Sequence, residues 1–325
     1  MRYPFLQSSR VHNLSSSIKS FYYQYITREW KVVYSLVALT LLLGFIDSMV
    51  NAFTYQFPGY QYLPLRWAFL IPVVLAITLL ALVAREQAPR LAFFTRSYGT
   101  YFFIVVAFAV LSTGIQYTPF NPIDVHLVAW DQWLGFNTPA LLAWTASHST
   151  IQRVLEGAYE FLNIEMLLIP LLLPLFQNET RVNRLFAALL IAFLLGTTVY
   201  YFFPTMSPVA MFHSPYFLAP EHTTYHKFYG IHHYEALTSD GGGLISFPSF
   251  HVVWAVILTA ATFPKKWIFF PLVLINFIVI LSTLFLGWHY LVDVFAGFAL
   301  ALIAIFLAYR FTVFHGIMPT GSCSN

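Results

Sequence analysis

Two short stretches of this chain carry residues that could do chemistry together. The first is the run Ser246-Phe247-Pro248-Ser249-Phe250-His251, and the second is Gly287-Trp288-His289-Tyr290-Leu291-Val292-Asp293. Each places a histidine where a loop is followed by a long apolar segment. In the second stretch Asp293 follows His289 by four residues, which puts both side chains on one face of a helix.

A carboxylate one helical turn from a histidine can fix the tautomer of the imidazole and stabilise its charged form. A histidine prepared in this way, His289, can attack phosphorus and hold the phosphoryl group covalently. A second histidine, His251, can then protonate the departing oxygen. The alternative is that His289 and Asp293 form a structural pair, which the spacing alone does not exclude.

The composition indicates which elements must position these residues. Hydrophobic residues make up 59% of the 325-residue chain and charged residues only 9%, whereas about a quarter of a soluble domain is charged. We therefore expect an all-α, polytopic membrane protein. The formal net charge of +3 is too small to indicate a nucleic-acid partner. The single cysteine, Cys323, excludes an intramolecular disulfide.

Apolar segments of spanning length predict about eight transmembrane helices. They lie near residues 32–53, 67–84, 100–117, 155–176, 185–203, 248–263, 267–286 and 289–309. The first is too long for a cleavable signal core and should remain as an anchor. We divide the chain into an N-terminal segment (1–31), two additional N-terminal helices (32–98), a six-helix catalytic core (99–310) and a tail (311–325).

The distribution of lysine and arginine predicts the orientation, because cytoplasmic loops carry an excess of both. With eight spans and both termini in the cytoplasm, thirteen of the sixteen basic residues face the cytoplasm. Both histidine stretches then lie on the extracytoplasmic side. If one helix were removed from the count, His251 and His289 would face opposite compartments.

Two loops on that predicted side are long. Residues 118–150 include a run of helical spacing that we interpret as a helix in the membrane interface, with Trp130 and Trp133 at headgroup depth. Residues 204–247 begin with Pro204-Thr205-Met206-Ser207-Pro208 and contain a triple glycine at 241–243. Loops of this length in a compact protein are often functional.

The two histidine stretches resemble the second and third signature motifs of the type 2 phosphatidic acid phosphatase superfamily. The Phe-Pro-Ser-x-His and His-Tyr-x-x-Asp blocks are closer to the branch of inositol phosphorylceramide synthase and sphingomyelin synthase, and the Pro-rich block at 204–208 resembles that branch as well. The resemblance covers the third to eighth spans. It implies a six-helix phosphatase-like core, with His289 as nucleophile, Asp293 as its orienting partner and His251 as acid and base.

The chain departs from the phosphatase motifs. Thr283 stands where the third motif has an arginine, Phe250 replaces the middle glycine of the second, and no Lys-x6-Arg-Pro block is present. These losses remove cations that would bind a dianionic phosphate, whereas a phosphodiester carries less charge. They favour transfer of a phospho-headgroup between lipids over hydrolysis of a phosphate monoester, which stays the alternative.

Other residues are candidates for binding the substrate. Arg153 and Lys227 are basic residues on the predicted outer side, although both could instead be interface anchors. The backbone amides of Ser249, Gly242 and Gly243 could hold an anion, although a triple glycine is also typical of a hinge. Glu160 could orient an acceptor hydroxyl.

We expect phospholipid or sphingolipid substrates, no metal and no cofactor. The loop histidines lack the spacing of a metal site. A bacterial inner membrane is the favoured location, or the Golgi lumen if the chain is eukaryotic. The competing class is a proton-coupled transporter, with Glu160, His289 and Asp293 as a relay. The sequence leaves the oligomeric state open.

Overall fold

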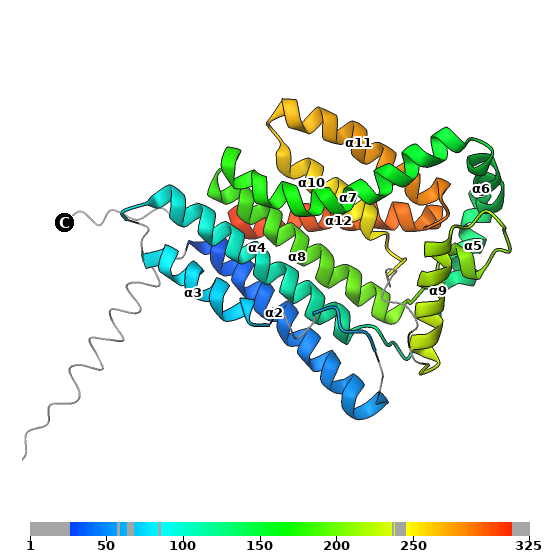
Figure 1. Cartoon of the computed structure of the whole chain (residues 1–325), viewed down its shortest axis with the longest axis horizontal. Helices are drawn as coiled ribbons and strands as arrows, with labels where there is room; N and C mark the ends of the chain where they lie inside the picture. Colours follow the sequence, from blue (N-terminus) through cyan, green and yellow to red (C-terminus); the bar gives the residue numbers. More distant parts are fainter. Residues whose placement is uncertain are drawn as a thin grey trace, which may run out of the picture.

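The computed structural model describes residues 27–56, 59–63, 68–83, 86–235, 237 and 245–313. Within these ranges every regular element is helical (Figure 1). The helices are α2 (Arg28–Val50, continued by a π-helical turn to Tyr55), α3 (Leu70–Val83), α4 (Pro89–Gly114), α5 (Asp124–Trp133), α6 (Thr138–Ala146), α7 (Ser149–Phe176), α8 (Glu179–Phe202), α9 (Ala219–His232), α10 (Phe250–Thr262), α11 (Lys266–Phe285) and α12 (Leu291–Val313).

Each of the eight predicted apolar ranges overlaps one of these helices, and α4 begins eleven residues before its predicted range. Six of the described helices, α2, α4, α7, α8, α11 and α12, are long and apolar enough to cross a membrane. The helices α3 and α10 are apolar but shorter, and α10 has 13 residues. At 1.5 Å per residue α10 extends about 20 Å, less than the roughly 30 Å of a hydrocarbon core. An all-helical fold with six candidate membrane spans is thus confirmed for the described residues, and the count of eight spans stays a prediction.

Helix α8 lies at the centre of the bundle. It packs against α2, α4, α10 and α12, and most of its apolar side chains are buried, including Phe186, Leu189 and Leu190. A helix that is apolar on all sides is expected in the interior of a bundle, where every face has a protein neighbour. The helices that carry the two histidine stretches, α10 and α12, are thus held against one common element.

Close approach between α10 and α12 depends on a glycine. A Cβ added at Gly297 of α12 would lie 2.5 Å from the carbonyl oxygen of Ser249, at the start of α10. The same region contains a backbone hydrogen bond of 3.2 Å from the Ser249 amide to the Asp293 carbonyl oxygen. The first turns of α10 and α12 are therefore in direct contact, and this contact brings the two stretches together.

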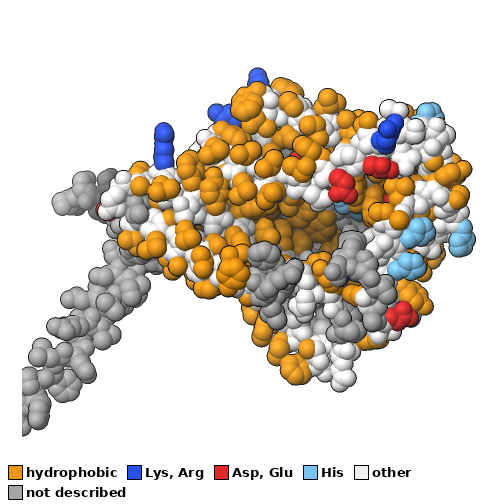
Figure 2. All heavy atoms as spheres, in the orientation of Figure 1, with side chains coloured by type: hydrophobic (Ala, Val, Ile, Leu, Met, Phe, Trp, Pro, Cys, Tyr) orange, Lys and Arg blue, Asp and Glu red, His pale blue; other side chains and the backbone are white. Residues whose placement is uncertain are grey.

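The helices α5, α6 and α9 gather at one end of the molecule (Figure 1). Residues 118–150, predicted to contain an interfacial helix, form α5 and α6. Trp130 and Trp133 of α5 are 53% and 84% exposed, while Asp124, Leu127 and Asp131 on its other face are buried. Acidic side chains and histidines are visible on this end of the molecule (Figure 2).

Candidate functional site

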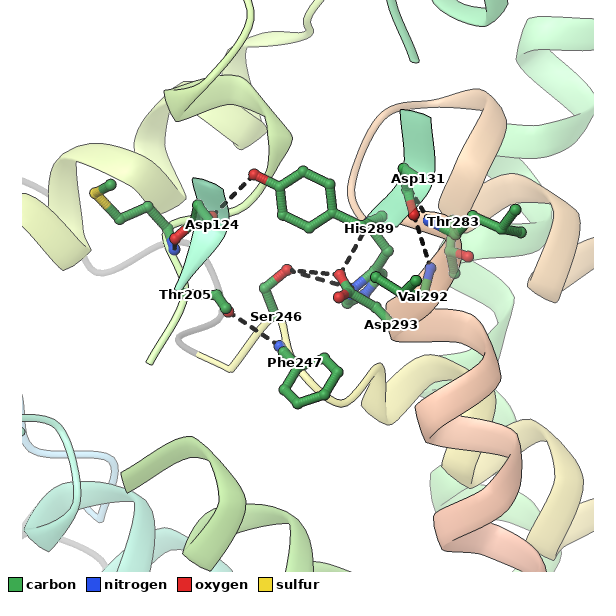
Figure 3. A network of polar contacts seen from close by, with 12 residues as sticks. Asp124, Asp131, Thr205, Ser246, Phe247, Thr283, His289, Val292 and Asp293 are labelled. Atoms are coloured by element: carbon green, nitrogen blue, oxygen red, sulfur yellow. Dashed lines mark hydrogen bonds and ion pairs between the residues drawn. The ribbon is translucent and has the colours of Figure 1, made fainter. Parts of the chain in front are cut away.

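The predicted His289–Asp293 pair is formed. Nδ1 of His289 lies 3.3 Å from Oδ2 of Asp293 (Figure 3). The same carboxylate oxygen accepts hydrogen bonds from the Ser246 hydroxyl at 3.3 Å and from the Tyr290 amide at 2.9 Å. Both partners are buried, His289 at 4% exposure and Asp293 at 0%. When Nδ1 donates its proton to this oxygen, Nε2 of His289 carries the lone pair.

The turn before α12 places His289. The His289 amide donates a 3.0 Å hydrogen bond to the carbonyl oxygen of Thr283, so the chain folds back after α11. Gly287 permits this reversal, because its φ of +79° is a conformation that L side chains rarely adopt. Thr283, which stands where phosphatases have an arginine, is fully buried. The Thr283 backbone oxygen fixes the position of the His289 backbone through this hydrogen bond.

His251 lies beside this pair. The ring centroids of His251 and His289 are 5.8 Å apart, with an angle of 62° between the ring planes. Tyr159 of α7 stacks on His251 at 4.1 Å and on Trp288 at 4.8 Å, so three rings lie one on another. The stack restricts the orientation of the His251 imidazole.

Both histidines line one cavity of about 370 Å³. Its other walls come from α7, α9 and the loops at 205–207 and 245–246; they include Glu160, Asn163, Thr205, Ser207, Thr224 and Trp288. None of the described residues that line this cavity is lysine or arginine. A group of phosphate size entering here would meet two imidazoles and several neutral or acidic polar side chains.

Burial lowers the pKa of His289 to about 4, and the contact with Ser246 opposes this shift only in part. A histidine with a lowered pKa is neutral near pH 7, so its Nε2 lone pair is available for attack on an electrophile. The neighbouring Asp293 carboxylate would stabilise the positive charge that His289 gains during such an attack.

Two carboxylates of α5 hold the second stretch in place, and sequence reasoning missed their role. Asp131 accepts hydrogen bonds from the amides of Leu291 at 2.8 Å and Val292 at 3.0 Å, and so caps the start of α12. Asp124 accepts from the Tyr290 hydroxyl at 2.9 Å and from the Met206 amide at 2.9 Å (Figure 3). Their spacing of seven residues on one helix face was the available signal.

These two carboxylates are poorly solvated. Burial raises the pKa of Asp124 to about 6, although hydrogen bonds from Met206 and Tyr290 oppose the shift. Burial also raises the pKa of Asp131. In α9, burial raises the pKa of Glu221 to about 8. Burial thus raises the pKa of three carboxylic acids in α5 and α9.

The Pro-rich block at 204–208 contributes to the same cavity. The Phe247 amide donates a 3.1 Å hydrogen bond to the hydroxyl of Thr205, which joins this block to the His251 stretch. Met206 and Ser207 also line the cavity. The block that resembles the synthase branch is therefore adjacent to both histidines.

The predicted substrate-binding residues do not all lie at the cavity. Glu160 lines it and accepts a 3.1 Å hydrogen bond from Asn163. Ser249 is buried, and its amide already donates to the Asp293 carbonyl oxygen, so this amide is not free to hold an anion. Gly242 and Gly243 lie outside the described residues.

The two predicted cations are placed elsewhere. Arg153 does not line the cavity, and its Nε donates a weak 3.4 Å hydrogen bond to the Ser149 carbonyl oxygen. Lys227 is 3% exposed, and its ammonium lies 4.7 Å from the ring centroids of both Tyr60 and Tyr62. The aromatic faces stabilise this cation. The geometry therefore gives no support to a phosphate-binding role for either residue.

No group of three or more potential metal ligands occurs in the part of the chain that the structure describes. The cavity is lined by two imidazoles and a set of polar side chains, and the Asp293 carboxylate lies behind His289.

Comparison with protein families gives one match. The model described as the PAP2 superfamily matches residues 125–307, which is more than half of the chain and includes both histidine stretches. Neither the curated proteins nor the solved structures give a match. On the strength of the family match, the chain belongs to the PAP2 superfamily.

Proposed function

We propose that this chain is a membrane lipid phosphotransferase that moves a phospho-headgroup from a donor lipid to an acceptor through phospho-His289. Membership in a superfamily of phosphatases and phosphotransferases supports phosphoryl chemistry on a lipid. The observation that carries the proposal is the placement of His251 and the His289–Asp293 pair at one cavity, with ring centroids 5.8 Å apart.

In the first step Nε2 of His289 attacks the phosphorus of the donor lipid. A nitrogen–phosphorus bond forms, and the bond from phosphorus to the leaving lipid oxygen breaks. His251, whose protonated form is favoured by the negative charge of the bound phosphate, gives its proton to that oxygen. Attack requires an approach of about 3 Å, and proton transfer requires a hydrogen bond of about 3 Å. A phosphoryl group between the two rings can satisfy both distances. Asp293 stabilises the charge that His289 acquires.

In the second step the acceptor hydroxyl loses its proton to His251 and attacks phosphorus. The bond between phosphorus and Nε2 breaks, and both histidines return to their first state. Glu160 and Asn163, at the wall of the cavity, are the side chains that we assign to the acceptor hydroxyl. Hydrolysis follows the same two steps with water as the acceptor.

Transfer is favoured over hydrolysis by the charge of the cavity. Phosphate monoesters carry up to two negative charges, and the described cavity walls offer them Glu160 and no lysine or arginine. A phosphodiester carries one charge and needs fewer cations. We therefore propose that the chain is a functional relative of inositol phosphorylceramide and sphingomyelin synthases, with the site facing the extracytoplasmic side.

The test is transfer of a labelled headgroup by purified protein in mixed micelles. His289→Ala and His251→Ala should each abolish transfer, whereas His213→Ala, which alters an exposed loop histidine, should not. Wild-type protein mixed with donor alone should accumulate an acid-labile, base-stable phosphoprotein that His289→Ala lacks. Activity retained by His289→Ala would refute the assignment.

Two further measurements separate the alternatives. Release of free phosphate without an alcohol acceptor would identify a phosphatase. Uptake into proteoliposomes that depends on a proton gradient would identify a transporter. Activity should persist in EDTA, and its loss there would indicate a metal enzyme.

A further inference from the structure

A second cavity lies far from the histidines. This groove of about 120 Å³ runs between α8, α10 and α12. Its residues come from the first turns of α8 and the last turns of α10 and α12, whereas His251 and His289 lie at the beginnings of α10 and α12. At 1.5 Å per residue, about 14 Å separates His251 from Ala260 along α10, and about 25 Å separates Leu291 from Ala308 along α12.

Two arginines line this groove, and the side chain of each donates a hydrogen bond to the protein. Nη1 of Arg181 donates a 2.6 Å hydrogen bond to the Phe263 carbonyl oxygen, and Nε of Arg184 donates a 3.0 Å bond to the Thr312 hydroxyl. The Arg184 guanidinium also lies 4.6 Å from the ring centroid of Tyr309. A guanidinium has five N–H donors, so each arginine keeps donors beyond the one that these contacts use.

The rest of the groove is apolar. Its walls are formed by alanines and by Leu185, Ile257 and Ile305. Glu179, the acid at the start of α8, pairs with Arg96 at 3.5 Å, which commits its charge to a partner outside this groove. The groove thus joins two cations to a hydrocarbon surface. A free anion would use only the first of these, and a neutral lipid only the second.

We propose that this groove binds one anionic phospholipid, whose phosphate contacts Arg181 and Arg184 and whose acyl chain lies along Leu185, Ile257 and Ile305. Bidentate contacts between guanidinium and phosphate suit this assignment. Exposed Lys265 and Lys266 lie in the neighbouring turn and do not line the groove. The bound lipid would join α8, α10 and α12 at the end opposite the reaction. The proposal does not depend on the proposed function.

The test is retention of lipid by purified full-length protein in native mass spectrometry, after incubation with equal amounts of phosphatidylglycerol and phosphatidylcholine. Wild-type protein should retain one phosphatidylglycerol in preference. The double variant Arg181→Gln/Arg184→Gln should retain at least about fivefold less. The double variant Lys265→Gln/Lys266→Gln loses the same charge away from the groove and should behave as the wild type.

A second variant keeps the test decisive if the arginine variant does not fold. Ala261→Leu keeps both arginines and fills the apolar part of the groove, and should also lower phosphatidylglycerol retention. Phosphatidylglycerol should raise the melting temperature of wild-type protein, whereas inorganic phosphate should not. Equal retention of both lipids, an equal loss in the lysine variant or equal stabilisation by inorganic phosphate would overturn the proposal.

Discussion

The carboxylate of Asp293 allows the loss of its charge to be separated from the loss of its hydrogen bonds. All three donors, from His289, Ser246 and Tyr290, meet at Oδ2. Oδ1 has no hydrogen-bond partner among the described residues. In Asp293→Asn the amide oxygen can take the place of Oδ2 and the amide nitrogen that of Oδ1. The variant then keeps the His289 tautomer and removes only the negative charge.

The magnitude follows from the 3.3 Å distance between His289 and Asp293. With an effective dielectric constant of about 20, two unit charges at this distance attract by about 5 kcal/mol. Because the transition state develops only part of the charge on His289, we expect Asp293→Asn to slow phosphoenzyme formation by about 10²- to 10⁴-fold. Ser246→Ala removes one hydrogen bond to the Asp293 carboxylate, worth about 1.5 kcal/mol, and should slow phosphoenzyme formation about tenfold.

The assay is single-turnover formation of phospho-His289 from a labelled donor lipid, with thermal unfolding as a control for folding. Asp293→Ala, which also loses control of the tautomer, should be at least as slow as Asp293→Asn. If Asp293→Asn stays within fivefold of wild type while its melting temperature is unchanged, the carboxylate charge does not support the reaction. The mechanism would then have to place the nucleophile elsewhere.

Three other predictions concern the elements around the pair. Asp131→Ala leaves the amides of Leu291 and Val292 without their acceptor and should lower the free energy of unfolding by about 3 kcal/mol. Unfolding in detergent measures this change. The variant Asp131→Asn keeps one acceptor, so its free energy of unfolding should fall by about half as much. Because burial raises the pKa of Glu221 from 4.5 to about 8, the folded protein binds this proton more tightly than the unfolded chain. The free energy of unfolding should therefore fall as pH rises from about 4.5 to about 8. If the melting temperature of Glu221→Gln fell with pH as steeply as that of wild type, the result would contradict this. Gly297→Ala forces α12 away from the Ser249 carbonyl and should lower transfer at least about tenfold, whereas Gly157→Ala, where a Cβ meets nothing within 4 Å, should leave transfer unchanged.

The central contacts of the site could be predicted because they depend on local spacing. His289 and Asp293 are four residues apart, so their pairing requires only that a helix begins near Leu291. The meeting of His251 with His289 required one more step, an antiparallel pair of helices between them, which the apolar lengths of α10 and α11 indicated. The helical fold followed from the scarcity of charge in long segments.

The remaining contacts could not be predicted, since they join residues far apart in the chain. Asp131 caps α12 across 160 positions, and Tyr159 of α7 stacks on His251. Lys227 was one candidate for binding the phosphate, and its ammonium lies against two tyrosines that precede it by more than 160 residues. A basic residue in a long loop gives no sign of which surface it will meet. Only the packing of α9 against the rest of the chain decides that.

Helix α5 connects the predicted membrane interface to the turn that carries His289. One of its faces exposes Trp130 and Trp133, side chains typical of the boundary between headgroups and hydrocarbon. On the other face, Asp124 accepts a hydrogen bond from Tyr290 and Asp131 accepts one from Leu291, at the start of α12. We therefore expect the depth of His289 in the bilayer to depend on the depth at which Trp130 and Trp133 lie. Bilayer thickness would then act as a control on turnover, which reconstitution in lipids of graded chain length would reveal.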